Sequence, residues 1–251
     1  MSQDVAICLG TFNRLTQLQS CIASARLTVG KLSYVCLVAD GGSTDGSREW
    51  LLAQPDCELL EGGLDGAVIA YNTAFARAVD LGCPWIVIVN DDDQFVAPPP
   101  DVQRSVAAMA KDARLGGVTF ETNLRGSWAV ERWRDHLPYI NKGVVSREAL
   151  MAAARAQGDP EGRRFWSPEW KTYAADTQAG LTVRKLGWLV GVGRGFRIID
   201  GAASKSDELR EKNFAEYRES RGPQLFNERW SSPLDAEYSR EFAEKFGGVL
   251  R

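Results

Sequence analysis

Three consecutive carboxylates follow an apolar run in the first half of the chain. The run covers residues 85–89, and Asn90, Asp91, Asp92 and Asp93 come directly after it. Its β-branched, unalternated composition predicts a strand buried on both faces of a parallel sheet, so the acids stand at the carboxyl end, where open α/β sheets bind ligands. Adjacent carboxylates repel one another unless solvent or a cation neutralises them. We therefore expect Mg²⁺ or Mn²⁺ bridging to a phosphate-bearing ligand, with a solvated acidic turn as the alternative.

Two further strand ends carry polar residues and glycine. Residues 5–9 and 34–39 have the composition of buried strands, and the turns 10–14 and 40–47 follow them. The glycines of the second turn permit positive φ, and its serine, threonine and aspartate can cap the next helix. If the three strands are parallel, their ends form one crevice. This crevice would hold hydrogen-bond donors, a carboxylate that contacts a nucleobase, and a metal site. This combination is typical of a nucleotide-diphosphate pocket.

Alternating strands and helices position these turns. The alternation predicts an α/β fold, with a Rossmann-like, mostly parallel sheet flanked by helices. The other elements that we expect are strands at 57–60, 117–122, 143–146 and 188–192, and helices at 15–25, 48–53, 67–81, 102–111, 147–156 and 177–186.

Residues 123–168 lose this periodicity and gather aromatic side chains. An irregular segment of this length usually carries function in a compact domain. Tryptophans such as Trp128 and Trp166 could stack on a sugar or a base, with ordinary packing as the alternative. Between residues 121 and 175 nine Lys and Arg, Lys142 among them, stand against seven acids, so we interpret these charges as a solvated face.

The overall composition is that of one globular domain. A chain of 251 residues, 44% hydrophobic and 25% charged, can bury a sizeable core. We expect residues 1–204 to form the domain and the charged residues 205–251 to add a helical C-terminal extension. A net charge of −3 gives no global attraction to nucleic acid or an anionic membrane. No apolar stretch approaches the ~18 residues of a transmembrane helix.

The chain start, the cysteines and the histidine narrow the class further. The first residues lack the basic n-region of a secretory signal, so we expect a cytoplasmic protein. Five scattered cysteines have neither zinc-site spacing nor a disulfide framework, and we interpret them as reduced core residues. His136 is the single histidine, which excludes most zinc-hydrolase and Ser-His or Cys-His mechanisms unless that residue serves.

Five motifs occur in order between residue 5 and about residue 204. They are Thr11-Phe12-Asn13-Arg14, the turn Asp40 to Gly46, Gly66 with Asn72, Asn90-Asp91-Asp92, and Asp176-Thr177 with Arg184-Lys185-Leu186-Gly187-Trp188. This ordered set resembles the family 2 glycosyltransferases of the GT-A fold, in which the third motif reads Asn-x-Gly-x5-Asn, the fourth is the metal-binding D-x-D and the fifth is an acidic helix.

The resemblance implies a metal-dependent, inverting transfer from a nucleoside-diphosphate sugar to an acceptor hydroxyl. Residues 1–122 would bind the nucleotide sugar and residues 123–204 the acceptor. Asp176 would be the general base, taking the proton of the acceptor hydroxyl while that oxygen attacks the anomeric carbon. The donor would lie against Asp40 at its base and against Thr11, Asn13, Arg14, Gly41, Ser43, Asn72 and Asp91 elsewhere, with the ion on Asp92.

Departures from the family pattern shift some of these roles. Asn90 replaces the first acid of D-x-D, so Asp91 or Asp93 could share the ion. Ala175 stands where a glutamate usually precedes the base. Where the family often has a late histidine ligand, this chain has Asp200, an oxygen ligand that suits Mg²⁺ or Mn²⁺.

Other functions compete with this interpretation. A sugar nucleotidyltransferase could share the sheet and the acids, but its glycine-rich first loop with a nearby lysine is absent. A degenerate nucleotide-sugar or glycan-binding module would bind without turnover, which Asn90 and Ala175 favour slightly. For the acceptor we expect a saccharide or lipid-linked saccharide. A hydroxylated base in DNA, as in viral DNA modification, is the less favoured alternative, and the donor sugar and oligomeric state stay open.

Overall fold

The structure is a computed structural model that describes residues 3–62, 66–96, 101–124, 127–129, 139–170 and 175–201. Within these ranges the strands form one sheet, in the order β3-β2-β1-β4-β8-β6-β9-β5, with β7 paired to β6. The strands are β1 (Val5–Thr11), β2 (Tyr34–Asp40), β3 (Cys57–Glu61), β4 (Trp85–Ile88), β5 (Gln94–Phe95), β6 (Leu115–Leu124), β7 (Ser127–Ala129), β8 (Gly143–Ser146) and β9 (Leu189–Ile199).

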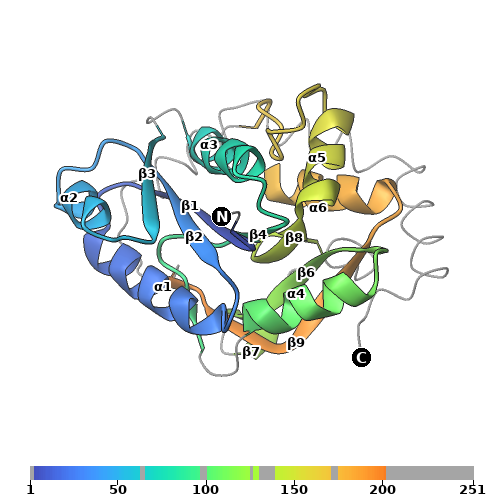
Figure 1. Ribbon diagram of the computed structural model, residues 1–251, viewed down its shortest axis with the longest axis horizontal. Coiled ribbons are helices and arrows are strands. Elements are labelled where there is room, and N and C mark those ends of the chain that lie inside the picture. The colour runs from blue at the N-terminus through green and yellow to red at the C-terminus, as the bar shows by residue number, and fades with distance from the viewer. Residues whose placement is uncertain are drawn as a thin grey trace.

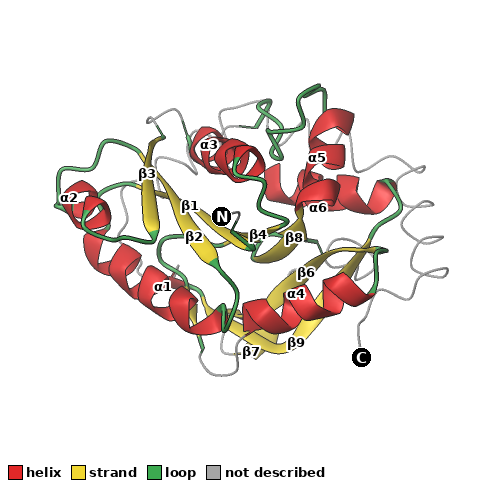
Figure 2. Ribbon diagram, in the orientation of Figure 1, coloured by secondary structure: helices red, strands yellow, loops and turns green. Residues whose placement is uncertain are grey.

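Helices cover both faces of the sheet (Figures 1 and 2). They are α1 (Leu15–Thr28), α2 (Ser47–Leu52), α3 (Ala67–Asp80), α4 (Asp101–Lys111), α5 (Arg147–Ala156) and α6 (Ala175–Lys185). Two apolar clusters follow from this layering: α3, α5 and α6 pack on one face, and α1, α2 and α4 on the other. Residues 5–9 of β1 are fully buried because both faces are covered, which explains their unalternated hydrophobic composition.

The sheet is mixed. The strands β3, β2, β1 and β4 are mutually parallel, as the sequence predicts. Beyond them β8 is antiparallel to both of its neighbours, β4 and β6, while β9 runs parallel to β6. The α/β class with helices on both faces is confirmed, with a sheet that is wholly parallel in its first half and mixed in its second.

Close backbone contact between β8 and β6 depends on glycine. A Cβ on Gly143 would lie 2.0 Å from the carbonyl oxygen of Val118 and 2.9 Å from the Cα of Thr119. Neither distance is compatible with a side chain, so this glycine lets β8 enter beside β6. That contact sets the position of the residue just before β8, Lys142.

Some expectations fall outside the described residues, namely those for His136 and for residues 205–251. In the part of the chain that the structure describes, no helix is long and apolar enough to cross a membrane.

Candidate active site

The end of β1 and the acidic run contact each other directly. Thr11 Oγ1 donates to Asp91 Oδ2 at 2.9 Å, and Arg14 Nη1 lies 3.0 Å from Asp91 Oδ1 and 3.2 Å from Asp92 Oδ2. These contacts follow from the parallel pairing of β1 with β4, which ends both strands at one edge. Burial raises the pKa of Asp91 to about 6, and the charge of Arg14 opposes that rise.

Antiparallel pairing brings two further charges to the same edge. The start of β8 pairs with the end of β4, and the end of β9 pairs with β5, which begins just after the acidic run. Lys142 precedes β8 and Asp200 follows β9, so both reach Asp93. The Nζ atom of Lys142 lies 2.7 Å from Asp93 Oδ1 and 2.9 Å from Asp200 Oδ2.

Lys142 is buried, which corrects the expectation of a solvated face at this position. Its side chain is only 5% exposed. Burial alone would lower the pKa of Lys142, but the carboxylates of Asp93 and Asp200 raise it above its ordinary value, so the ammonium stays charged. One feature of the sequence indicated this burial: Lys142 stands between Ile140 and the apolar strand 143–146.

Three carboxylates of this edge form a candidate cation site. Oxygen atoms of Asp92, Asp93 and Asp200 all lie within 4.8 Å of one another. The end of β9 packs directly on the acidic run, since a Cβ on Gly201 would lie 2.2 Å from the Asp92 carbonyl oxygen. Hard oxygen donors of this kind fit Mg²⁺ or Mn²⁺. Two of the three acids, however, already share the ammonium of Lys142.

Tyr71 and Asn90 shape the backbone of the acidic run. The Tyr71 hydroxyl lies 2.7 Å from the Val89 carbonyl oxygen and 2.8 Å from Asn90 Oδ1. The Asn90 N–H donates to Asp93 Oδ2 at 2.8 Å. Both Asp93 oxygens therefore have partners within the protein. Sequence reasoning missed Tyr71, because its position on α3 gives the helix an ordinary apolar face.

The turns after β1 and β2 are tied together through their polar groups. Asn13, with φ of 51°, receives the N–H of Thr44 on its Oδ1 at 2.8 Å and donates its own N–H to Ser43 Oγ at 2.8 Å. The N–H of Gly41 donates to the Thr11 carbonyl oxygen at 2.9 Å. The two turns thus form one surface beside the acids.

Asp40 is saturated with internal partners. Its Oδ2 accepts from the N–H groups of Gly42 and Ser43 at 2.9 Å each and from Arg48 at 2.8 Å, and its Oδ1 accepts from the Ser43 hydroxyl. Burial would raise the pKa of Asp40, but the Ser43 and Arg48 hydrogen bonds hold it below its ordinary value. Arg48, which also pairs with Glu61 at 2.6 Å, is a second residue that sequence reasoning missed.

Asn72 binds the backbone of Trp166. Its Nδ2 donates to the Trp166 carbonyl oxygen at 2.7 Å, and its Oδ1 accepts the Trp166 N–H at 3.0 Å. The ring of Trp166 packs on Tyr71, with the two centroids 4.3 Å apart. The amide of Asn72 thus joins α3 to the segment ahead of α6, and the described contacts do not bring it to the acids.

Asp176 stands in the first turn of α6. Its Oδ1 accepts the Thr177 N–H at 2.7 Å. A carboxylate in the first turn is favoured by the partial positive charge of the helix N-terminus. Residues 171–174, directly ahead of it, lie outside the described part of the chain.

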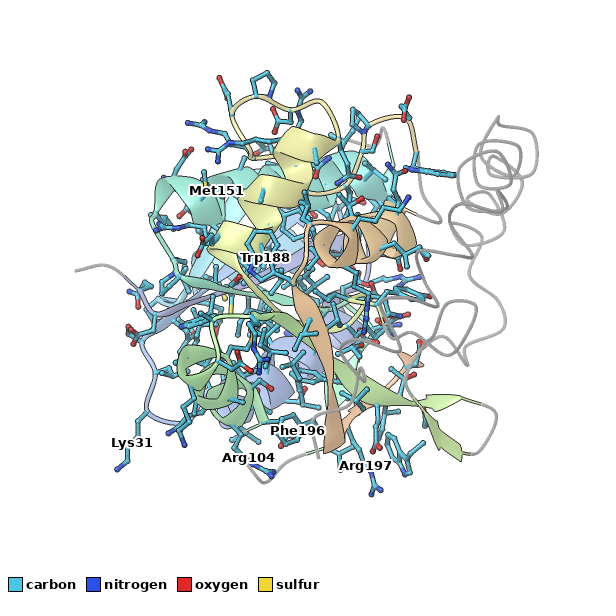
Figure 3. The ribbon with its side chains drawn as sticks, turned by 90° about the vertical axis from the view of Figure 1, so that its right-hand side faces the viewer. Lys31, Arg104, Met151, Trp188, Phe196 and Arg197 are labelled. Atoms are coloured by element: carbon cyan, nitrogen blue, oxygen red, sulfur yellow. The ribbon has the colours of Figure 1, made fainter. Side chains whose placement is uncertain are left out.

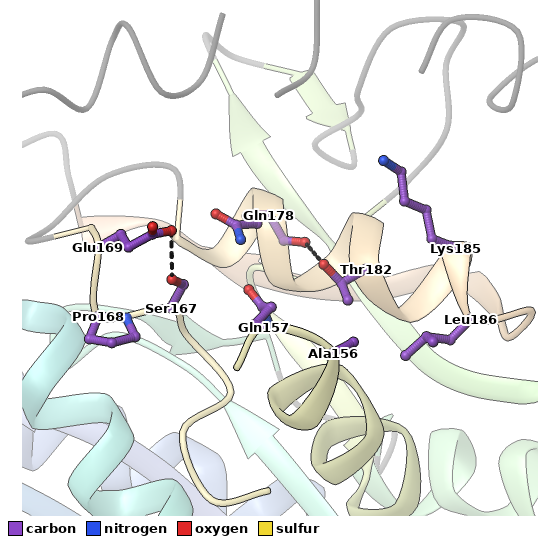
Figure 4. A pocket seen from close by; sticks show the side chains of 9 residues that line it. All are labelled: Ala156, Gln157, Ser167, Pro168, Glu169, Gln178, Thr182, Lys185 and Leu186. Atoms are coloured by element: carbon purple, nitrogen blue, oxygen red, sulfur yellow. Dashed lines mark hydrogen bonds between the residues drawn. The ribbon is translucent and has the colours of Figure 1, made fainter. Parts of the chain in front are cut away.

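A pocket of about 570 Å³ runs along α6, between the end of α5 and residues 167–169 (Figure 4). Its lining mixes hydroxyl, amide, carboxylate and ammonium groups. Ser167 Oγ donates to Glu169 at 3.3 Å, and Thr182 Oγ1 donates to the Gln178 carbonyl oxygen at 2.8 Å. Gln178 lies within one turn of Asp176 on the same helix.

Solved structures of low sequence identity share this fold. The mannosyltransferase PcManGT from Pyrobaculum calidifontis, in complex with GDP-Man and Mn²⁺, aligns with 97% of this chain and 74% of its own at 17% identity, with a TM-score of 0.59. S. aureus TarS 1-349 in complex with UDP-GlcNAc aligns with 96% of this chain and 71% of its own at 13% identity, also with a TM-score of 0.59. Another S. aureus TarS structure aligns with 71% of this chain and 34% of its own at 15% identity, with a TM-score of 0.51. The fold is that of the GT-A glycosyltransferases.

Sequence comparison gives the family. The family model described as Glycosyl transferase family 2 matches residues 6–157, which is more than half of the chain. The chain therefore belongs to glycosyl transferase family 2. No curated protein matches it significantly.

Proposed function

We propose that the chain moves a sugar from a nucleoside-diphosphate sugar to an acceptor hydroxyl, with inversion at the anomeric carbon, in a reaction that requires Mg²⁺ or Mn²⁺. The observation that carries this proposal is the gathering of Asp91, Asp92, Asp93 and Asp200 at the edge where β1 and β4 end. Such an edge suits a diphosphate and a divalent cation. Membership of the family supports the transfer chemistry.

The donor side of the site uses the first two turns. Thr11, Asn13, Arg14 and Ser43 would surround the nucleoside and phosphates, and Asp92, facing Asp93 and Asp200, would hold the ion. An ion held there would neutralise the charge that develops on the departing nucleoside diphosphate. Arg14 keeps Asp91 and Asp92 together before any ligand binds.

On the acceptor side we assign Asp176 as the general base. Its carboxylate would take the proton from the acceptor hydroxyl as that oxygen attacks. The pocket along α6 supports a polyhydroxylated acceptor, because its hydroxyl and amide groups can exchange hydrogen bonds with sugar hydroxyls. We propose a saccharide or lipid-linked saccharide, and the net charge of −3 disfavours DNA.

The state of the cysteines supports a location in a reducing compartment. All five are free and four are buried, which is the usual state in the cytoplasm, where we place the protein.

Product analysis tests the proposal. The chain is incubated with Mn²⁺, a panel of nucleotide sugars and oligosaccharide acceptors, and the nucleotide product and the anomeric configuration are measured. We expect a nucleoside diphosphate and an inverted glycoside. A parallel assay supplies a nucleoside triphosphate and a sugar 1-phosphate, and pyrophosphate release there would identify a nucleotidyltransferase instead. Tight nucleotide binding without any release in either assay would identify a binding module.

A further inference from the structure

Lys142 is the one described lysine that lies among the acids, and its backbone is held rigidly. Its carbonyl oxygen accepts the Phe120 N–H at 2.9 Å and the Thr119 hydroxyl at 3.2 Å. The next residue, Gly143, is pressed against the backbone of β6. The ammonium is therefore positioned by the sheet, and its 5% exposure leaves it little freedom to reach a ligand in the crevice.

The charges of the described cluster do not cancel. Four carboxylates, those of Asp91, Asp92, Asp93 and Asp200, contact two cations, one from Arg14 and one from Lys142. With all four carboxylates ionised, two negative charges are left over. A single divalent cation would neutralise them, whereas without Lys142 the excess would be three.

The carboxylates of the cluster differ in how many of their oxygens already have partners within the protein. Asp93 uses one oxygen for Lys142 and the other for the Asn90 N–H, and Asp200 also contacts Lys142. Asp92 contacts Arg14 through Oδ2 at 3.2 Å, a longer and weaker contact than those of Asp93. The least committed described carboxylate of the three is thus that of Asp92.

We propose that Lys142 is a resident counter-ion of the site: it holds Asp93 and Asp200 together as a fixed wall, and so leaves the divalent ion to bind through Asp92 and the phosphate oxygens of the donor. This inference rests on the proposed metal site. It makes Lys142 a positioning residue. It also predicts that the ion binds weakly until a diphosphate supplies the missing oxygen ligands.

Mn²⁺ binding to the unliganded chain tests this role. Free Mn²⁺ is measured by electron paramagnetic resonance in titrations of the wild type, Lys142→Met and Lys31→Met, first alone and then with GDP or UDP. Lys31 is exposed and projects from the surface (Figure 3). It precedes the start of β2, at the opposite end of the parallel strands from the acids, so it provides a matched loss of charge. Thermal unfolding with and without Mn²⁺ is recorded in parallel.

We expect Lys142→Met to bind Mn²⁺ at least about tenfold more tightly than the wild type without nucleotide, because a unit charge a few ångströms away is removed and two carboxylates are released. The same variant should unfold at a lower temperature than the wild type without Mn²⁺ and recover when Mn²⁺ is added, since the ion replaces the lost charge. Lys31→Met should match the wild type in both measurements.

A Lys142→Met chain that binds Mn²⁺ no more tightly than the wild type would overturn the proposal. If that variant fails to fold, the double variant Asp93→Asn with Lys142→Met decides, because it removes both charges of the pair. We expect its Mn²⁺ affinity to stay near wild type, whereas a loss of more than about tenfold, or about 1.4 kcal/mol, would make Asp93 a ligand and contradict the proposal. Neither measurement uses a sugar donor, so a chain that binds as expected but transfers no sugar would refute the proposed function alone.

Discussion

Asp40 illustrates how one carboxylate can serve structure and binding at once. It is buried and receives four hydrogen bonds from its own turn and from Arg48. A nucleobase would have to share this side chain with those donors. Removing the charge should therefore mainly lower the stability of the turn.

We expect Asp40→Asn to lower the free energy of unfolding by about 1.5–3 kcal/mol, the range for hydrogen bonds to a charged group, measured by urea denaturation. Because the folded pKa of Asp40 lies below its unfolded value, this contribution is complete at pH 7 and is lost as the pH falls below about 4. Asp112→Asn is the control, since its ion pair with Arg114 is on the surface and should hardly matter. Unchanged stability with weaker nucleotide binding would show that Asp40 acts on the base alone.

Asp176 is the residue on which the proposed mechanism depends most. We expect Asp176→Asn to lower kcat by roughly 10²–10⁴-fold, the range for loss of a general base, with nucleotide affinity near wild type by calorimetry. The asparagine Oδ1 can still accept the Thr177 N–H, so the start of α6 should be kept. Wild-type turnover in this variant would remove Asp176 from the mechanism and leave it as a helix-terminal acid.

At the scale of elements, the pair of hydrogen bonds between Asn72 and Trp166 connects α3 to the segment ahead of α6. Asn72→Ala leaves both the N–H and the carbonyl oxygen of Trp166 unpaired, and we expect a loss of about 1–3 kcal/mol in the free energy of unfolding. Thr73→Ala, the next residue on α3, removes only an exposed hydrogen bond to Ile69 and serves as the control. A normal unfolding midpoint with reduced nucleotide affinity would return Asn72 to the donor site.

The elements set by local periodicity could be predicted from the sequence. Strand 143–146 and helix 147–156 agree with β8 and α5 at both ends. Strand β9 was expected to end near residue 192 but runs to Ile199, because Gly193 and Gly195 interrupt its apolar run while pairing with β6 continues across a register shift. The sequence alone does not show such pairing.

The ion pair of Lys142 could not be predicted for the same reason. Its partner Asp93 lies 49 residues away, and only the antiparallel register of β8 against β4 joins them. The converging ends of β1, β2 and β4 could be predicted, because buried parallel strands are recognised by their continuous hydrophobic composition. Motif order located the turns to which we assign the donor, but the internal hydrogen bonds of Asp40 and Asn72 are visible only in the structure.

At the scale of the whole molecule, the candidate site lies where the parallel half of the sheet meets the mixed half. The strand β4 borders β8, and the end of β9 reaches the acids through β5. The Arg104 guanidinium lies 4.5 Å from the centre of the Phe196 ring and joins α4 to β9 (Figure 3). The Arg197 guanidinium lies 4.9 Å from the centre of the Trp128 ring and joins β9 to β7. Both halves of the chain thus contribute carboxylates to one proposed cation site.

The most direct test of this account is the metal dependence of sugar transfer. Initial rates of nucleoside diphosphate release from the active nucleotide sugar are measured for the wild type and Asp92→Asn, after treatment with EDTA and again with added Mn²⁺. We expect no release from either chain in EDTA, full recovery of the wild type with Mn²⁺, and little recovery of Asp92→Asn. Undiminished release by the wild type in excess EDTA would contradict the account.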